Sequence, residues 1–180
     1  MLSSQQHIIS HVSTWLGDQK SVWLCTILKT WGSSPRPVGA MMACTVEGEL
    51  VGSISGGCIE EDFLEQLRDG SLKSQFDEMQ KPFVVKYGVT AEEQARLKLP
   101  CGGQLHVLLE YIESNESNRD IFDRLKTDLE QHKSVSRIVD LGNGQISASP
   151  NSSDEAVVLD EDSMAHSLSP MYRLLLLGAG

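Results

Sequence analysis

The chain has 180 residues, of which 40% are hydrophobic, enough for one domain with a sizeable core or for two small ones. Its 25 acidic side chains outnumber the 15 lysines and arginines, and the net charge is −10. An acidic surface repels phosphate backbones, and no apolar run reaches membrane-spanning length. We therefore expect neither a nucleic-acid nor a membrane partner.

The first half of the chain alternates between helical and strand-like patterns. Apolar side chains recur at helical spacing before Gly17, and a short, partly β-branched apolar run follows. A loop with two prolines and two glycines comes next, and a turn at Glu47-Gly48 separates two short strands. The expected elements are a helix ending at Gly17, a strand buried on both faces over residues 21–30, a loop over 31–39, strands over 40–45 and 49–53, and a helix over 58–69.

The second half has weaker patterns. Thr90 and Glu93 have capping-box spacing, which predicts a short helix, and Leu141–Gly144 between two apolar runs predicts a hairpin. The expected elements are strands over 82–87 and 104–111, a short helix from Thr90, a linker at 114–118, a helix over 121–129, and hairpin strands over 135–139 and 145–148. Together they predict an α/β fold with helices around a mixed β-sheet.

The last residues have an unusual pattern. Residues 172–180 read as a strand of a parallel sheet that runs into the first two glycines of a GxGxxG turn. The helix that a dinucleotide site needs does not follow in this sequence. We interpret the segment as the start of a further domain in a longer protein; the alternative is an apolar edge strand.

Two cysteines lie beside glycine pairs, in Gly56-Gly57-Cys58 and in Cys101-Gly102-Gly103. Where a glycine loop enters a helix, backbone N–H groups and the helix dipole form an anion-binding concavity and favour a thiolate. The helical wheel directs Cys58 away from the apolar stripe of its helix. The three carboxylates that follow Cys58 oppose this field, and we expect them to be exposed and screened by solvent. A glycine-rich turn with a small capping residue is the alternative.

Two further features complete the candidate site. Cys101 follows Pro100 at the mouth of a strand, although a free cysteine is often only a small buried hydrophobe. Ser33, Ser34 and Arg36 lie on a stiff proline-rich loop, where a guanidinium is held ready for a phosphate or carboxylate. The alternative is a rigid surface loop with a solvated arginine. The four cysteines form neither a CxxC nor a zinc spacing, and the N-terminus has no signal-peptide pattern, so we expect reduced thiols in the cytoplasm.

These loops, in this order, closely resemble the XdhC/CoxI family, the accessory proteins of molybdenum hydroxylases such as xanthine dehydrogenase and carbon monoxide dehydrogenase. The matching stretches are TWGSSPRPVGAMM at 30–42, GSISGGCIE at 52–60, YGV at 87–89 and LPCGG at 99–103. From this resemblance we predict an XdhC/CoxI-like domain over 5–112, a small α/β extension over 118–149, a flexible acidic linker over 150–170 and an incomplete Rossmann-like domain beginning at 171–180.

The resemblance implies a chaperone that binds the molybdenum cofactor (molybdopterin), supports its sulfuration by a cysteine desulfurase and delivers it to a molybdenum hydroxylase apoenzyme. It implies an accessory protein rather than an enzyme, in the cytoplasm, and we expect a homo-oligomer. An NAD(P) site would need a complete Rossmann-like domain. The residues expected to bind the cofactor are Ser33, Ser34, Arg36, Ser55, Gly56, Gly57, Cys58, Cys101, Gly102 and Gly103, with Cys58 and Cys101 near the metal.

Two other classes of function remain open from the residues alone. One is an oxidoreductase that depends on a thiol or on nicotinamide and uses Cys58 with a completed Rossmann segment. The other is an interaction domain whose glycine loops only turn corners. Thiol reactivity and molybdenum content discriminate between these readings and the chaperone.

Overall fold

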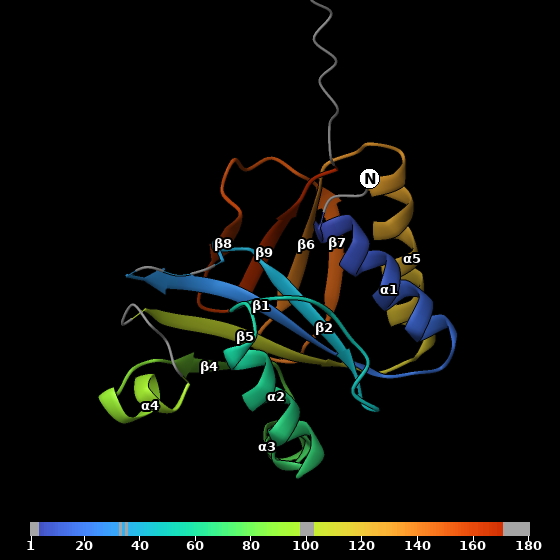
Figure 1. Ribbon diagram of the computed structural model, residues 1–180. Helices are drawn as coiled ribbons and strands as arrows, with labels where there is room; N and C mark the ends of the chain where they lie inside the picture. Colours follow the sequence, from blue (N-terminus) through green and yellow to red (C-terminus); the bar gives the residue numbers. More distant parts are fainter. Residues whose placement is uncertain (1–3, 33, 35, 98–102, 171–180) are drawn as a thin grey trace, which may run out of the picture.

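A computed structural model describes residues 4–32, 34, 36–97 and 103–170 and confirms the α/β class. Its strands form two sheets rather than one (Figure 1). The first sheet has the order β3-β2-β1-β5-β4 and the second the order β7-β6-β9-β8. The strands are β1 (Val22–Trp31), β2 (Met41–Thr45), β3 (Leu50–Gly52), β4 (Phe83–Tyr87), β5 (Gln104–Ile112), β6 (Val135–Asp140), β7 (Ile146–Pro150), β8 (Val157–Leu159) and β9 (Ser163–Leu168). The helices are α1 (Ser4–Gly17), α2 (Cys58–Arg68), α3 (Ser71–Met79), α4 (Ala91–Arg96) and α5 (Glu116–Glu130).

The expectation of a mixed sheet was wrong in one respect. Every pairing between described strands is antiparallel. A parallel pair needs a crossover of a dozen or more residues, whereas β2–β3 and β6–β7 are joined by short turns that allow only antiparallel pairing. The apolar run of β1 is nevertheless buried on both faces as predicted, because apolar layers pack against both faces of the first sheet.

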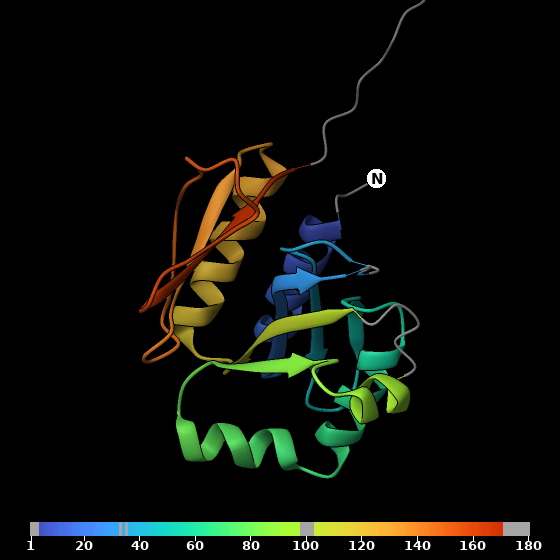
Figure 2. The same ribbon diagram turned by 90° about the vertical axis from the view of Figure 1, so that its left-hand side faces the viewer.

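Each face of the first sheet packs against a different layer. On one face, Trp23 of β1 and Phe83 of β4 form a core with Phe63 of α2 and Leu72 of α3. The other face packs against α1, α5 and the second sheet, so that β1 is sandwiched between two apolar layers (Figure 2). The loops between strands therefore project only from the ends of the sheet.

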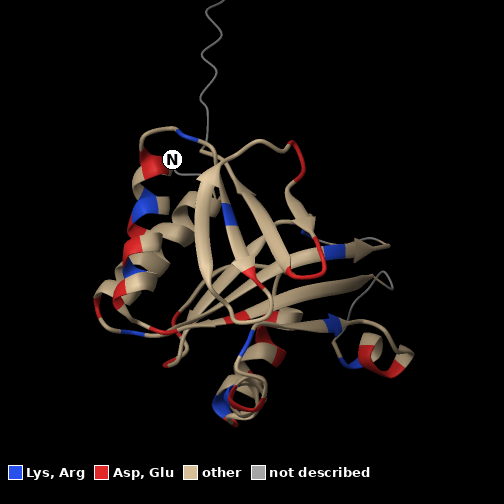
Figure 3. Ribbon diagram, turned by 180° about the vertical axis from the view of Figure 1, so that it is seen from behind, with Lys and Arg blue, Asp and Glu red and all other residues tan. Residues whose placement is uncertain are grey.

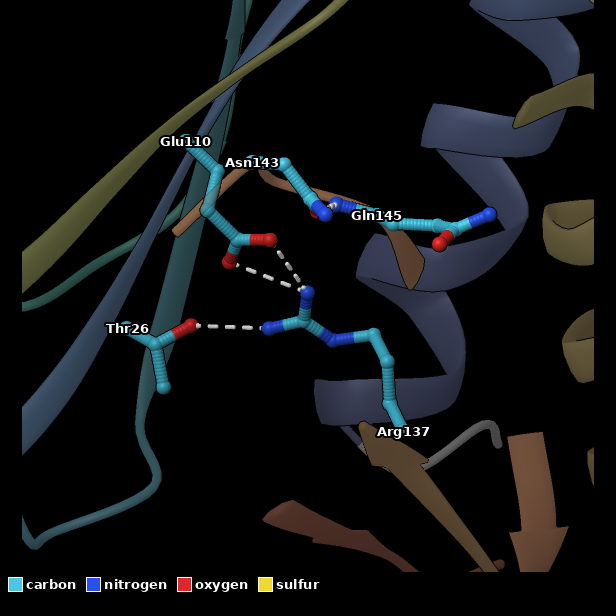
Figure 4. A network of polar contacts seen from close by, with 5 residues as sticks. All are labelled: Thr26, Glu110, Arg137, Asn143 and Gln145. Carbon is cyan, nitrogen blue, oxygen red and sulfur yellow. Dashed lines mark hydrogen bonds and ion pairs between the residues drawn. The ribbon is translucent and has the colours of Figure 1, made fainter. Parts of the chain in front are cut away.

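A buried ion pair joins the two sheets (Figure 4). Nη1 of Arg137, on β6, lies 2.7 and 2.9 Å from the two carboxylate oxygens of Glu110, on β5, and Nη2 donates to the Thr26 hydroxyl at 3.3 Å. The exposed fractions of Arg137 and Glu110 are 0% and 2%. Such a pair fixes how two layers dock, because either charge left alone in this interior would be strongly unfavourable.

Residues 150–170 form part of the second sheet, which corrects the expected flexible linker. They include β8 and β9, and β9 pairs with β6 along its whole length. Met164, His166 and Leu168 alternate inward, while small and polar residues face outward. The serine- and acid-rich composition therefore describes the outer surface of a strand and its turns. The first strand expected at 171–180 lies outside the described residues.

Two smaller differences concern helices. The sequence patterns did not indicate α3, which begins after Gly70, a glycine in the left-handed region with φ of 79°. The expected linker at 114–118 is mostly the first turn of α5, because the Asn115 side chain accepts a hydrogen bond from the Asn118 N–H at 2.9 Å and caps the helix.

No helix in the described part of the chain is both long and apolar enough to cross a membrane.

Candidate functional site

The loops of the sequence motifs meet at one end of the first sheet. Trp31, the last residue of β1, pairs with Gln104 at the start of β5, and Tyr87, the last residue of β4, pairs with the next residue of β5. β3 ends on the same side, because Gly52 pairs with the second residue of β2. Figures 1 and 2 show the loops gathered there. We call this side the loop end and define it by the described residues 32, 34, 36–40, 53–57, 88–90 and 103.

The side chain of Glu60, in the first turn of α2, fills the inside of the glycine loop. Its Oε1 accepts hydrogen bonds from the Ser53 hydroxyl at 2.7 Å and from the N–H groups of Ile54 and Ser55 at 2.8 and 3.0 Å. Its Oε2 accepts from the Gly57 N–H at 2.9 Å and from the Ser55 hydroxyl. Burial alone would raise the pKa of this carboxyl, but the hydrogen bonds from Ser55 and Ser53 outweigh burial and lower the pKa to about 2. The chain thus supplies its own anion to this loop.

This arrangement corrects the expectation of exposed carboxylates for two of the three that follow Cys58, whereas Glu61 is exposed as expected. Glu60 and Asp62 are each only 7% exposed. Asp62 forms an ion pair with Arg96 of α4, which fastens the two helices together. Asp62 and Glu60 are therefore engaged inside the protein and are not screened by solvent.

The outer side of the glycine loop remains open. Gly56 and Gly57 have φ of 85° and 138°, and no described atom lies within 4 Å of a Cβ built on either residue. The N–H of Gly57 points at Glu60 and that of Gly56 at the Ser53 hydroxyl, so these donors do not face outward. The loop therefore offers a ligand a flat, side-chain-free backbone surface rather than a ring of donors.

Cys58 lies at the edge of this open surface. It is the first residue of α2 and is partly exposed, with a free thiol next to the positive end of the helix dipole. Cys25 and Cys44 differ from it, because both are buried in the core between the first sheet and α2. Burial raises the pKa of both thiols, that of Cys44 to about 12, so they remain protonated at neutral pH.

The proline-rich loop is held at its base by the second sheet. His166 of β9 donates from Nε2 to the Gly39 carbonyl at 2.9 Å. Gly39 has φ of 83°, and a Cβ there would lie 3.0 Å from the Cβ of Ala156. The Ser34 hydroxyl donates to the Arg36 carbonyl at 2.8 Å, and the exposed Arg36 guanidinium forms no ion pair with a described residue. Arg36 is thus available at the loop end on a braced segment.

Three predicted site residues, Ser33, Cys101 and Gly102, lie outside the described residues. Gly103 is described and buried, directly before β5. The predicted proximity of Cys58 and Cys101 therefore stays a prediction, as does a shared metal. Within the described ranges, no three His, Cys, Asp or Glu side chains are grouped as a metal site.

The most consequential residue that the sequence analysis missed is Glu60. Glu60 stands three positions after Gly57, which is capping-box spacing, and this signal could have identified its contact with the Gly57 N–H. Ser55, predicted to contact the cofactor, is buried and bound to Glu60, so it shapes the loop from inside.

Comparison with known proteins connects this geometry to a family. The model of the XdhC and CoxI family matches residues 15–85. This stretch of the chain is therefore similar to the XdhC and CoxI family. It includes β1 to β3, α2, the proline-rich loop and the glycine loop, so it supplies most of the loop end.

Two curated relatives extend the XdhC and CoxI match. A protein of Bacillus subtilis (strain 168) that is named as a probable component of xanthine dehydrogenase is 27% identical over 126 residues, which are 69% of this chain and 36% of that protein. The molybdenum cofactor insertion chaperone PaoD of Escherichia coli (strain K12) is 28% identical over 120 residues, 64% of this chain and 33% of that protein. The chain thus spans about a third of the length of these relatives.

A solved structure supports the fold. The crystal structure of a xanthine dehydrogenase from Bacillus halodurans aligns with a TM-score of 0.65 and 24% sequence identity. The alignment covers 93% of this chain and 53% of that one. Both sheets of this chain therefore belong to one recurrent architecture.

Proposed function

We propose that this chain belongs to an accessory protein that binds the molybdenum cofactor at the loop end and delivers it to a molybdenum hydroxylase apoenzyme. The observation that carries the proposal is the partly exposed thiol of Cys58 at the rim of the open Gly56-Gly57 surface. A soft sulfur next to a bare backbone surface suits a flat ligand that carries a sulfur-ligated metal. The relative named as a molybdenum cofactor insertion chaperone supports the same cargo.

Different residues at the loop end bind different parts of the cofactor in this proposal. The backbone of Gly56 and Gly57 faces the metal-bearing end of the cofactor, and Cys58 lies near its sulfur and metal. Arg36 and Ser33 supply cationic and hydroxyl donors for the anionic part. The Ser34 hydroxyl donates to the Arg36 carbonyl and stiffens the segment that carries Arg36. Cys101, Gly102 and Gly103 complete the set of residues that bind the cofactor in this proposal. Glu60 and Ser55 hold the loop in shape and do not touch the cargo.

Delivery requires contact with other proteins. Trp31 and Val89 are 45% and 50% exposed, and both lie at or beside the loop end. Exposed apolar side chains next to a cargo site suit transient docking of a target apoenzyme. In the proposed sequence of events a cysteine desulfurase sulfurates the bound cofactor before transfer. The protein acts in the cytoplasm as a homo-oligomer, with its thiols reduced.

The test is cofactor binding by the chain and by single thiol variants. Isolated molybdenum cofactor is mixed with wild type, Cys58→Ala and Cys44→Ala, and molybdenum is measured in the protein peak after gel filtration. Cys44 is a matched control, because its thiol is buried. Cofactor retained by wild type and Cys44→Ala but lost by Cys58→Ala supports the proposal. Equal retention by all three contradicts the role of Cys58, and no retention by wild type favours an interaction domain.

A further inference from the structure

Basic side chains line up across three strands at the loop end. The register pairs Lys29 of β1 with His106 of β5, and pairs the same His106 with Lys86 of β4. Side chains at paired positions share a face of a sheet, with Cβ atoms about 5 Å apart. The two lysines therefore flank the histidine in one row, which we call the basic row.

A bulge in β1 creates this row. Ile27 pairs with Val107 and Lys29 with His106, so Leu28 is an extra residue on its strand. Leu28 is buried in the core between the two sheets, and the bulge brings Lys29 to the same face of the sheet. The basic row therefore lies on the face opposite α2, just beyond the apolar contact between the sheets.

The lysines of the basic row have no acidic partner in the described part of the chain. Six ion pairs occupy other basic side chains, and none includes Lys29 or Lys86. Figure 3 shows the basic segments near the loop-end tips of β1 and β4, in a protein whose net charge is −10. Burial, Lys86 and Lys29 lower the pKa of His106. Two lysines without an acidic partner, on the two strands that flank β5, place an excess of positive charge on either side of His106, which suits an anionic ligand.

An aromatic ring adjoins the basic row. Trp31 stands two positions after Lys29 on β1, and its ring centroid lies 4.5 Å from that of His106 at an interplanar angle of 59°. Trp31 is 45% exposed, whereas Trp15 and Trp23 are 8% and 0% exposed. A fixed indole with one open face is a stacking platform for a planar ring.

We propose that the basic row binds a phosphate monoester and that Trp31 stacks on the planar heterocycle that carries it. Lysine ammonium groups reach a phosphate as flexible point charges, and the neutral His106 donates a further hydrogen bond. The pterin phosphate of the molybdenum cofactor and a purine nucleotide share this chemistry. Only the first of these sources rests on the proposed chaperone function.

The test measures three probes on the full chain by equilibrium dialysis and by quenching of Trp fluorescence. The probes are guanosine monophosphate, guanosine and isolated molybdenum cofactor. The variants are Lys29→Gln with Lys86→Gln, and Trp31→Leu. The control is Lys81→Gln with Lys126→Gln, which removes the same charge from two lysines that form no ion pair with a described residue. Circular dichroism checks that each variant is folded.

A phosphate-bearing probe should lose about tenfold in affinity in the double lysine variant and keep its affinity in the control, since charge-assisted contacts have this magnitude. Trp31→Leu should weaken the same probe and abolish the fluorescence change. A phosphate-bearing probe that binds the double lysine variant and wild type equally overturns the site, and so does absence of binding by both phosphate-bearing probes. Guanosine, which lacks the phosphate, should not respond to the lysines.

The outcomes of this experiment distinguish failure of the phosphate site from failure of the proposed chaperone function. Lysine-dependent cofactor binding identifies the pterin as ligand and supports both. Lysine-dependent binding of guanosine monophosphate without cofactor binding supports a nucleotide site and contradicts the chaperone. Cofactor binding that depends on Cys58 but not on the lysines supports the chaperone and overturns the phosphate site.

Discussion

The glycine loop and the basic row lie at the same end of one sheet, yet they differ in how their charges are satisfied. In the glycine loop, Glu60 accepts the inward-facing donors of its own segment, so the polar groups close on themselves. In the basic row, Lys29 and Lys86 have no partner in the described part of the chain. The conspicuous motif thus provides a rigid surface, and the inconspicuous row provides free charge for a ligand.

The largest predicted effect concerns two deeply buried charges, the ion pair between the sheets. Replacing Glu110 by Gln leaves Arg137 buried and uncompensated, and should lower the free energy of unfolding by about 4 kcal/mol in urea titrations at neutral pH. The double variant Glu110→Leu with Arg137→Met should recover most of that loss. A loss below about 1 kcal/mol in Glu110→Gln would mean that water relieves the remaining charge.

A matched pair of glycine variants compares a glycine whose Cβ position is crowded by neighbouring atoms with one whose Cβ position is open. Gly52 and Gly56 have φ of 81° and 85°, but a Cβ on Gly52 would lie 2.5 Å from the Met41 carbonyl oxygen, while one on Gly56 meets nothing within 4 Å among the described atoms. Gly52→Ala should therefore cost about 3 kcal/mol of stability, from strain and overpacking together, and Gly56→Ala about 1 kcal/mol from strain alone.

The functional readout of this pair is cofactor retention by folded protein. The methyl group of Gly56→Ala projects into the surface proposed for the cargo, so retention should fall although the fold survives. Unchanged retention by Gly56→Ala would indicate that the cargo does not lie on this surface.

The ionisation of Glu60 makes the stability of the fold depend on pH. Its pKa is lowered to about 2 in the fold from an ordinary value of 4.5, so its stabilising effect is complete above pH 4.5 and disappears as the pH falls toward 2. Glu60→Gln should lower stability by about 2 kcal/mol at neutral pH, because charge-assisted hydrogen bonds are lost. Urea titrations between pH 5 and pH 2 should show wild type losing stability more steeply than the variant. Parallel curves would contradict the assigned role of Glu60.

The smallest predicted effect concerns the two lysines of the basic row. Without ligand, Lys86→Gln removes the repulsion of Lys29, which lies two strands away, and should raise the free energy of unfolding by about 0.3 kcal/mol at low salt, with no difference at high salt. The pKa of His106 should rise, because Lys86 lowers it in wild type. NMR titration of the imidazole measures that shift. An unchanged His106 pKa would mean that Lys86 does not face it.

Much of the fold could be predicted where local patterns are strong. The helix before Gly17, the buried strand β1 and the hairpin of β6 and β7 lie where the sequence patterns indicated. The hydrophobic period decides these elements without reference to the rest of the chain. The expected linker at 150–170 was wrong because β9 has only three inward residues, and its stability comes from pairing with β6, about thirty residues away in sequence.

The site could be predicted only in part for a related reason. Glycines and Cys58 mark a loop in the sequence, but the motif does not reveal that Glu60 occupies the loop from inside. Lys29, Lys86 and His106 have no motif at all, because only the strand register and a bulge bring them into one row. Contacts made by register between distant strands are not visible in a single sequence.

The position of β5 matters for anyone who dissects this protein into fragments. The family match ends at residue 85, yet β5 at 104–112 is the strand that joins β4 to β1, so a fragment cut at the homology boundary loses β5 and the end of β4 and leaves one edge of β1 unpaired. A cut at residue 112 would still remove Arg137 and leave Glu110 facing an empty interior. A homology boundary and a folding boundary are different places in this chain, and a fragment meant to fold must continue through β9.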